Sequence, residues 1–214
     1  MMKKKIAIIC GREQLSADVE FLARFSTLLG AMSFELIHEP SSGQTIPQQG
    51  FLFSLFKKVV FGLRINYLFR WALRIFNRYQ SQASVTWRIN QLRAMLHAMD
   101  LTDAEVYLIG RSAGALVASH LAIEFPVKAV IALGYPFIHP KHGVQQHRIQ
   151  HLPHMHIPMY ILQGIYDEYG TPRQISKIPM SDFVQVCYLD TDHNFVLDQS
   201  EWGRFESLIQ RYLA

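Results

Sequence analysis

Residues 105–120 read EVYLIGRSAGALVASH, and this stretch determines the fold. Its first part, Val106 to Ile109, is a short apolar run typical of a buried strand. The motif G-x-S-x-G follows at residues 110–114, and the Ala- and Leu-rich residues after it favour a helix. A strand, a tight turn and a helix with this motif indicate a nucleophile elbow, which would present Ser112 at the end of a strand. The pentapeptide also occurs by chance in strand-to-helix loops, so further motifs in the chain are needed to distinguish a catalytic elbow from a chance match.

The 214 residues contain six short apolar runs that predict strands, and helical patterns lie between most of them. The predicted strands are residues 5–10, 33–38, 106–109, 127–133, 157–162 and 183–189. The predicted helices are 16–29 with Ser16 as N-cap and Gly30 as stop, 84–99, one from Ser112 to near Phe125, a short one at Thr171-Pro172, and 198–213. This alternation predicts a single three-layer α/β domain over residues 1–214. Its sheet would have six strands, be mostly parallel, lack an N-terminal antiparallel pair and carry helices on both faces.

Three polar residues follow three of these strands, in the order Ser112, Asp167, His193. Parallel strands end at the same edge of a sheet, where ligands bind and catalysis takes place. A serine needs a general base, which His193 would supply, and a carboxylate at Asp167 would stabilise the protonated imidazole. Glu168 and Asp192 are competitors for the role of Asp167. The pattern predicts a Ser-Asp-His catalytic triad.

Acyl transfer through a serine also requires two N–H donors for the developing oxyanion. The backbone N–H of Ala113, directly after the nucleophile, is the first candidate. The second would come from the loop after the first strand, at Gly11 or Arg12. These residues predict the oxyanion hole.

The GRSAG motif, Tyr135-Pro136, the run PMYILQGIYDEYGTP and the stretch DTDHNF resemble the α/β-hydrolase superfamily on its dienelactone-hydrolase-like side. They are most similar to the group that includes the testis-expressed hydrolase-like proteins and the hydrolase-like subunit of the NSL histone-acetyltransferase complex. The resemblance extends from about residue 104 to the C-terminus. It implies an α/β-hydrolase fold, the triad Ser112, Asp167 and His193, and hydrolysis of an ester or thioester without a cofactor. It does not imply which substrate is used.

Two positions depart from the pattern of that group. Ala115 stands where a second glycine is usual after the elbow, and Cys10-Gly11-Arg12-Glu13 replaces a small, Gly/Ala-rich oxyanion loop. Arg12 would either block the hole or bind an anionic substrate. A non-catalytic interaction module with a hydrolase fold is therefore the alternative to an active esterase.

The formal charge of +4 conceals a local excess of basic residues. Residues 40–99 contain eight Lys and Arg and no Asp or Glu, and residues 51–80 add many aromatic side chains. For the variable segment 41–99, this composition favours a helix with an arginine face packed on the sheet. A lid over the site, or a helix on an anionic membrane surface as in a lipid hydrolase, are the alternatives. We expect no nucleic-acid partner, because no motif of that kind occurs.

Cys10 and Cys187 are too few for a disulfide framework and predict free thiols in a reducing, cytoplasmic location. Six of the ten histidines fall in residues 139–156. Their spacing and the intervening prolines favour a solvent-exposed loop over a zinc site, so no metal is predicted.

Overall fold

In the computed structural model, the described residues are 3–11, 15, 18, 20–39 and 85–214. They contain a six-stranded sheet of order β2-β1-β3-β4-β7-β8 in which every pairing is parallel. Its strands are β1 Lys4–Cys10, β2 Phe34–His38, β3 Ala104–Arg111, β4 Ala129–Leu133, β7 Met159–Gly164 and β8 Val184–Leu189. The predicted three-layer α/β-hydrolase fold with six strands is therefore confirmed.

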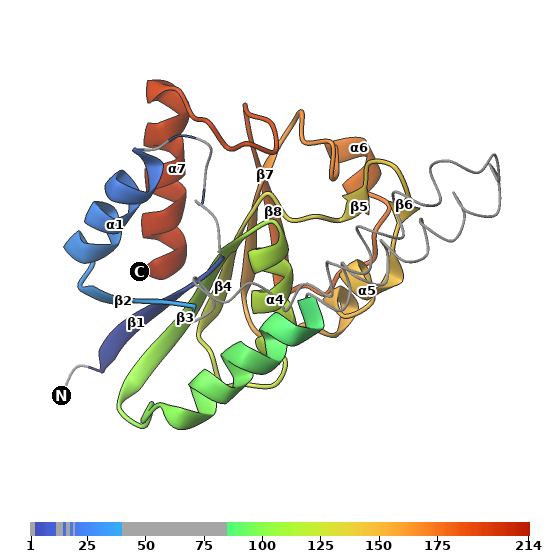
Figure 1. Cartoon of the computed structure of the whole chain (residues 1–214). Helices are drawn as coiled ribbons and strands as arrows, with labels where there is room; N and C mark the ends of the chain where they lie inside the picture. The colour runs from blue at the N-terminus through green and yellow to red at the C-terminus, as the bar shows by residue number, and fades with distance from the viewer. Residues whose placement is uncertain (1–2, 12–14, 16–17, 19, 40–84) are drawn as a thin grey trace, which may run out of the picture.

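Helices cover both faces of this sheet (Figure 1). On one face lie α1 Phe21–Ala31 and α7 Gln199–Leu213, and on the other lie α4 Ala113–Leu121 and the helix 85–98. Each face has its own apolar core, and alternate residues of β1 enter one or the other: Ala7 and Ile9 pack with α1 and α7, and Ile6 and Ile8 with α4. Burial on both faces explains why the strands read as continuous apolar runs.

The first helix differs from the sequence prediction at both ends. It begins at Phe21 after the N-cap Glu20, so the predicted start at Ser16 is wrong. Gly30 lies inside the helix, and Ser33 takes the left-handed φ of +64° that allows the chain to turn into β2. The predicted stop at Gly30 is wrong because a serine provides the positive φ, which glycine more often supplies. The helix after Ser112 also ends earlier than predicted, at Leu121.

The histidine-rich residues 139–156 are partly buried, so the prediction of a solvent-exposed loop is wrong. They include the antiparallel pair β5 Ile138–His139 and β6 Gly143–Val144, the short helix α5 Gln146–Ile149 and the 3₁₀ helix η1 Leu152–His154. Ile149, Leu152 and Met155 enter the core beside α4, and Arg148 and His151 are buried with them. Apolar residues between the histidines anchor this segment.

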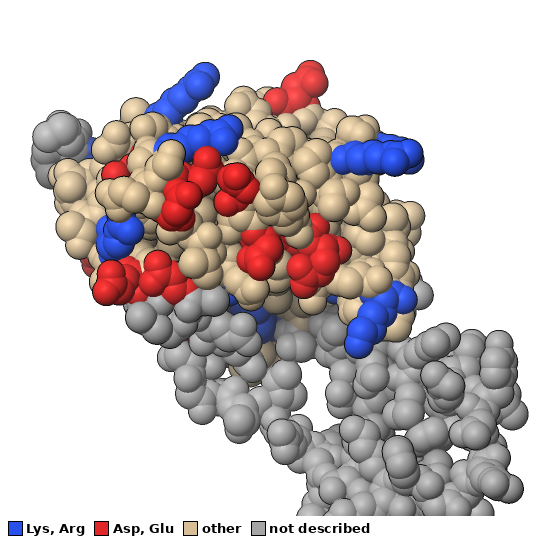
Figure 2. All heavy atoms as spheres, turned by 90° about the horizontal axis from the view of Figure 1, so that it is seen from above, with Lys and Arg blue, Asp and Glu red and all other residues tan. Residues whose placement is uncertain are grey.

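The segment 40–84 lies outside the described residues, and so do the predicted lid and membrane-binding surface at 51–80. Among the described residues on either side of it, Glu39 and Arg88 form a buried bidentate ion pair with N–O distances of 2.9 and 2.6 Å. On the face seen in Figure 2, Asp and Glu side chains lie among Lys and Arg side chains on the described part of the molecule. Of the helices in the described ranges, none has the length and hydropathy to cross a membrane.

Candidate active site

Ser112 stands at the turn between β3 and α4 in a strained backbone conformation. Its φ of 50° and ψ of −118° are rarely adopted by a residue with a side chain. The two flanking glycines make this turn possible. A Cβ at Gly110 would lie 2.5 Å from the Gly114 carbonyl carbon, and a Cβ at Gly114 would lie 1.8 Å from the carbonyl oxygen of Cys10. The strand, tight turn and helix expected around Ser112 are present. Gly110 is required where α4 approaches β3, and Gly114 where α4 packs against the end of β1.

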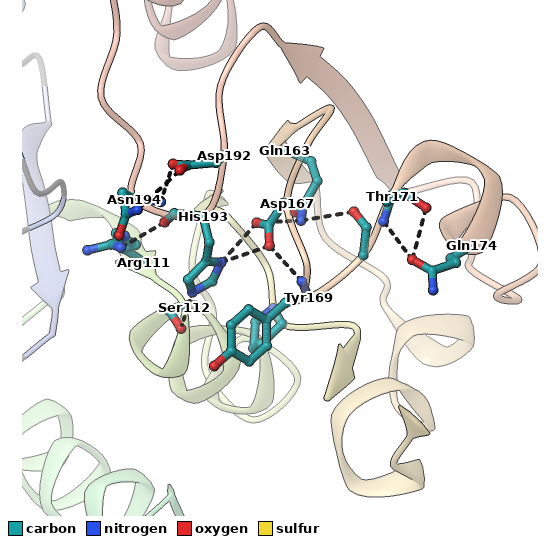
Figure 3. A network of polar contacts seen from close by, with 12 residues as sticks. Arg111, Ser112, Gln163, Asp167, Tyr169, Thr171, Gln174, Asp192, His193 and Asn194 are labelled. Carbon is teal, nitrogen blue, oxygen red and sulfur yellow. Dashed lines mark hydrogen bonds and ion pairs between the residues drawn. The ribbon is translucent and has the colours of Figure 1, made fainter. Parts of the chain in front are cut away.

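The structure brings the three predicted side chains together (Figure 3). His193 Nε2 lies 3.0 Å from Ser112 Oγ, and His193 Nδ1 lies 3.0 and 2.9 Å from the two carboxylate oxygens of Asp167. With Nδ1–H donating to the carboxylate, Nε2 is left to accept the serine hydroxyl proton. Ser112, Asp167 and His193 follow β3, β7 and β8, so all three lie at the C-terminal edge of the sheet. Ser112 is half-buried and Asp167 is fully buried.

Asp167 is held by groups other than His193. Its Oδ2 accepts a 2.8 Å hydrogen bond from Gln163 Nε2, and its Oδ1 accepts one of the same length from the Tyr169 backbone N–H. Gly134, with φ of +57°, packs against the same carboxylate, where a Cβ would lie 3.3 Å from Oδ2. A buried carboxylate needs such donors to keep its charge and its orientation.

The two competing carboxylates take other positions. Glu168 is exposed, and the Asp192 carboxylate accepts hydrogen bonds from the backbone and side chain of Asn194, at 2.8 and 3.1 Å. Neither has a hydrogen bond to His193 among the described residues. The order Ser, Asp, His predicted from strand ends therefore selects the same carboxylate as the geometry does.

Two residues that the sequence analysis missed hold His193 in place. Arg111 Nη2 donates to the His193 carbonyl oxygen at 2.7 Å, which ties the elbow to the loop after β8. The Tyr169 ring lies against the imidazole, with ring centroids 4.2 Å apart and planes at 34°, as Figure 3 shows. Arg111 occupies a variable position of G-x-S-x-G and Tyr169 follows Asp167 by two. Proximity to the motif was the only available signal.

The candidate oxyanion donors are partly described. Ala113 is the first residue of α4, so its N–H has no acceptor within the helix and can bind a substrate oxygen. Gly11 is half-buried at the end of β1, and its Cα would lie 3.3 Å from a Cβ at Gly114. The loop after β1 thus starts beside the elbow. Arg12 lies outside the described residues.

A second serine and histidine pair lies about two turns further along α4. His151 Nε2 is 2.8 Å from Ser119 Oγ, but Ser119 is fully buried and His151 is 7% exposed. The Ser119 hydroxyl donates to the Leu116 carbonyl, and Tyr135 Oη donates to the Arg148 carbonyl. His151 Nε2–H is therefore the donor to Ser119. This buried pair is part of the packing between α4 and the segment 134–156.

Within the described ranges, no group of three His, Cys, Asp or Glu is placed to hold a metal ion. Both cysteines are free thiols, Cys10 fully buried and Cys187 half-buried. Burial raises the pKa of the Cys10 thiol, which keeps it protonated and unreactive at neutral pH.

The sequence model of the alpha/beta hydrolase domain family matches residues 57–213, and the chain therefore belongs to that family. No match is found among the curated proteins compared with this sequence. The narrower resemblance to the dienelactone-hydrolase-like proteins stays a prediction.

Several solved structures share the fold. An α/β serine hydrolase homologue from Coxiella burnetii is 17% identical with a TM-score of 0.61, covering 100% of this chain and 87% of that one. The PEG-bound complex of a cold-adapted esterase from an Arctic intertidal metagenomic library is 13% identical with a TM-score of 0.60, covering 100% and 85%. An esterase from Pyrococcus furiosus is 12% identical with a TM-score of 0.56, covering 99% and 82%. At these identities the likeness shows the fold alone.

Proposed function

We propose that the chain is a serine hydrolase that cleaves an ester or thioester through an acyl intermediate on Ser112. The observation that supports this most directly is the continuous hydrogen-bond chain from Ser112 Oγ through His193 to Asp167, with contacts of 2.9 to 3.0 Å. A strained elbow and a fully buried carboxylate are costly features, and such features cluster at functional sites.

In the proposed reaction, Ser112 Oγ attacks the carbonyl carbon while its proton passes to His193 Nε2. Asp167 stabilises the imidazolium, and the N–H groups of Ala113 and Gly11 bind the oxyanion. The tetrahedral intermediate expels the alcohol or thiol, which takes the proton from His193. Water then attacks the acyl-serine by the same route and releases the carboxylic acid. No cofactor is needed.

We extend the proposal to the narrower group within the family and to the cellular location of the protein. The narrower kinship with the dienelactone-hydrolase-like group is supported by the GRSAG motif, the Tyr135-Pro136 pair, the run PMYILQGIYDEYGTP and the stretch DTDHNF. A cytoplasmic location is supported by the two free thiols. The membrane-surface lipid hydrolase is an alternative that depends on residues 51–80.

Turnover of short 4-nitrophenyl esters and acyl thioesters by the purified chain tests the proposal. We expect Ser112→Ala to reduce kcat by up to about a million-fold, as for other triad nucleophiles. Ser119→Ala removes the serine of the buried pair and serves as the matched control, which should keep its activity. Equal activity of wild-type and Ser112→Ala protein would overturn the role of Ser112. If the folded wild-type protein turned over no ester, the non-catalytic interaction module would be favoured.

A further inference from the structure

Arg148 is a buried cation without a carboxylate partner. The residue is 9% exposed, and its guanidinium donates to two neutral acceptors, Gln145 Oε1 at 2.7 Å and the Pro136 carbonyl at 3.2 Å. Among the described residues it takes part in no ion pair. By contrast, the equally buried Arg88 is neutralised by Glu39. A buried charge without a counterion is strongly unfavourable.

The sequence offers Arg148 no nearby acid along the chain. Residues 125–166 contain neither Asp nor Glu, and Lys128 and Lys141 add further positive charge. The segment 40–84 has no acidic residue either. Burial accordingly lowers the pKa of Arg148, yet a guanidinium stays charged at neutral pH. The positive charge is therefore a lasting feature of this region.

One nitrogen of the guanidinium is still available to a ligand. Nε and Nη1 are occupied, whereas Nη2 has no hydrogen bond within the described part of the chain. The fully buried side-chain atoms that lack a hydrogen bond in that part include His151 Nδ1 and Gln163 Oε1, but not Nη2 of Arg148. Arg148 as a whole is 9% exposed. Arg148 thus presents one free donor from an otherwise fixed side chain.

The loop that accepts a hydrogen bond from Arg148 also contacts the proposed triad. Pro136, whose carbonyl binds Arg148, is two residues from Gly134, so their Cα atoms lie within about 8 Å. Gly134 itself packs against the triad, since a Cβ there would be 3.3 Å from Asp167 Oδ2 and 3.5 Å from His193 Nδ1. On the same side, the Ile138 N–H donates to the Tyr169 carbonyl at 2.8 Å, and the Tyr169 ring covers His193. Arg148 is therefore connected to the triad through the residues that follow β4.

We propose that Arg148 binds a carboxylate group of the substrate, so that the preferred ester or thioester carries a negative charge a few bonds from the scissile carbonyl. The inference rests on the proposed hydrolase function. An incoming carboxylate would accept a hydrogen bond from Nη2 and neutralise the buried guanidinium. Gln145 and Pro136 fix the side chain beforehand, so little freedom is lost on binding.

Matched pairs of esters test this. The first pair is 4-nitrophenyl hydrogen adipate and 4-nitrophenyl hexanoate, with the charge on the acyl side. The second is 4-(hexanoyloxy)benzoate and phenyl hexanoate, with the charge on the leaving group. We expect the wild-type protein to prefer the charged member of at least one pair in kcat/KM. In Arg148→Gln this preference should fall by about tenfold or more, the usual effect of losing a charged hydrogen bond. Arg173→Gln, at an exposed position of the short helix α6 Pro172–Ile175, is the control that should keep this preference.

A second measurement distinguishes failure of this inference from failure of the proposed hydrolase function. Adipate should slow the labelling of Ser112 by a fluorophosphonate in wild-type protein and in Arg148→Lys, but much less in Arg148→Gln, while hexanamide should not discriminate. The inference fails, and Arg148 is structural, if Ser112 is labelled but the wild-type protein neither prefers the charged esters nor is protected from labelling by adipate. Equal losses on charged and neutral esters in Arg148→Gln would also overturn the inference. If Ser112 is not labelled in folded protein, the hydrolase function itself fails.

Discussion

Gly114 packs against the carbonyl oxygen of Cys10 so closely that a Cβ would stand 1.8 Å from that oxygen. This contact sets the distance between α4 and the end of β1, and hence between Ala113 and Gly11, the two proposed oxyanion donors. A motif glycine in this elbow is therefore a packing requirement between two elements that are distant in sequence.

Replacement of Gly114 by alanine should accordingly destabilise the protein severely, because backbone atoms of β1 and α4 must separate. Gly203 in α7 is the matched control, since a Cβ there meets nothing within 4 Å. Gly203→Ala should stabilise the protein by up to about 1 kcal/mol through helix propensity. Thermal unfolding of both variants checks the contrast, and similar midpoints would contradict the packing described here.

The ion pair between Glu39 and Arg88 should behave as a buried unit. Arg88→Met leaves the Glu39 carboxylate without its partner and should lower the free energy of unfolding by about 3–5 kcal/mol. Adding Glu39→Gln to that variant should restore part of the loss, because the uncompensated charge is removed. Urea unfolding at pH 7 measures both variants. Simple additivity of the two costs would show that the charges are not coupled.

Stability should fall on acidification through half-buried His120 and buried His151. Their rings stack with centroids 3.9 Å apart, and burial lowers both pKa values, that of His151 to about 3. Unfolded histidines titrate near 6.5, so below about pH 6.5 the unfolded chain binds more protons than the folded one. His151→Gln, which can still donate to Ser119, should reduce the slope of stability against pH by up to about 1.4 kcal/mol per unit between pH 6 and 4. Identical slopes in wild type and variant would contradict the neutral, buried state of His151.

The Tyr169 ring should matter for turnover independently of its backbone. Its N–H donates to Asp167 whatever the side chain is, whereas only an aromatic ring stacks on His193. We expect Tyr169→Phe to keep nearly full activity and Tyr169→Leu to lose about tenfold in kcat, because the imidazole becomes less well oriented. Tyr166→Leu, at a 66% exposed neighbouring position, is the control. Equal activity of the Phe and Leu variants would show that the ring has no positioning role.

The tight turn at Ser112 and the meeting of Ser112, Asp167 and His193 were predictable because both depend on local patterns. G-x-S-x-G imposes a turn that only glycines allow on either side of Ser112, and Asp167 and His193 follow apolar runs that can only be buried strands. The sheet was predictable for the same reason, since each strand shows burial on both faces.

The errors arose where tertiary contacts override local preference. Ser33 takes the positive φ because the chain must turn there to enter β2. The sequence pointed instead to Gly30, because glycine is the residue that most often adopts a positive φ. His151 and Arg148 read as polar loop residues, but the apolar residues Ile149 and Leu152 between and beside them draw the segment under α4. The clamp of Arg111 on the His193 carbonyl joins residues 82 positions apart, so only the folded chain shows it.

Labelling of Ser112 by a fluorophosphonate, read by mass spectrometry of the modified peptide, tests the central claim most directly. The probe reacts only with a serine whose hydroxyl is activated by a base, so the account predicts modification at Ser112 in wild-type protein. Labelling should be lost in His193→Ala and retained in Ser119→Ala. Absence of labelling in well-folded wild-type protein, or labelling that persists without His193, would contradict it.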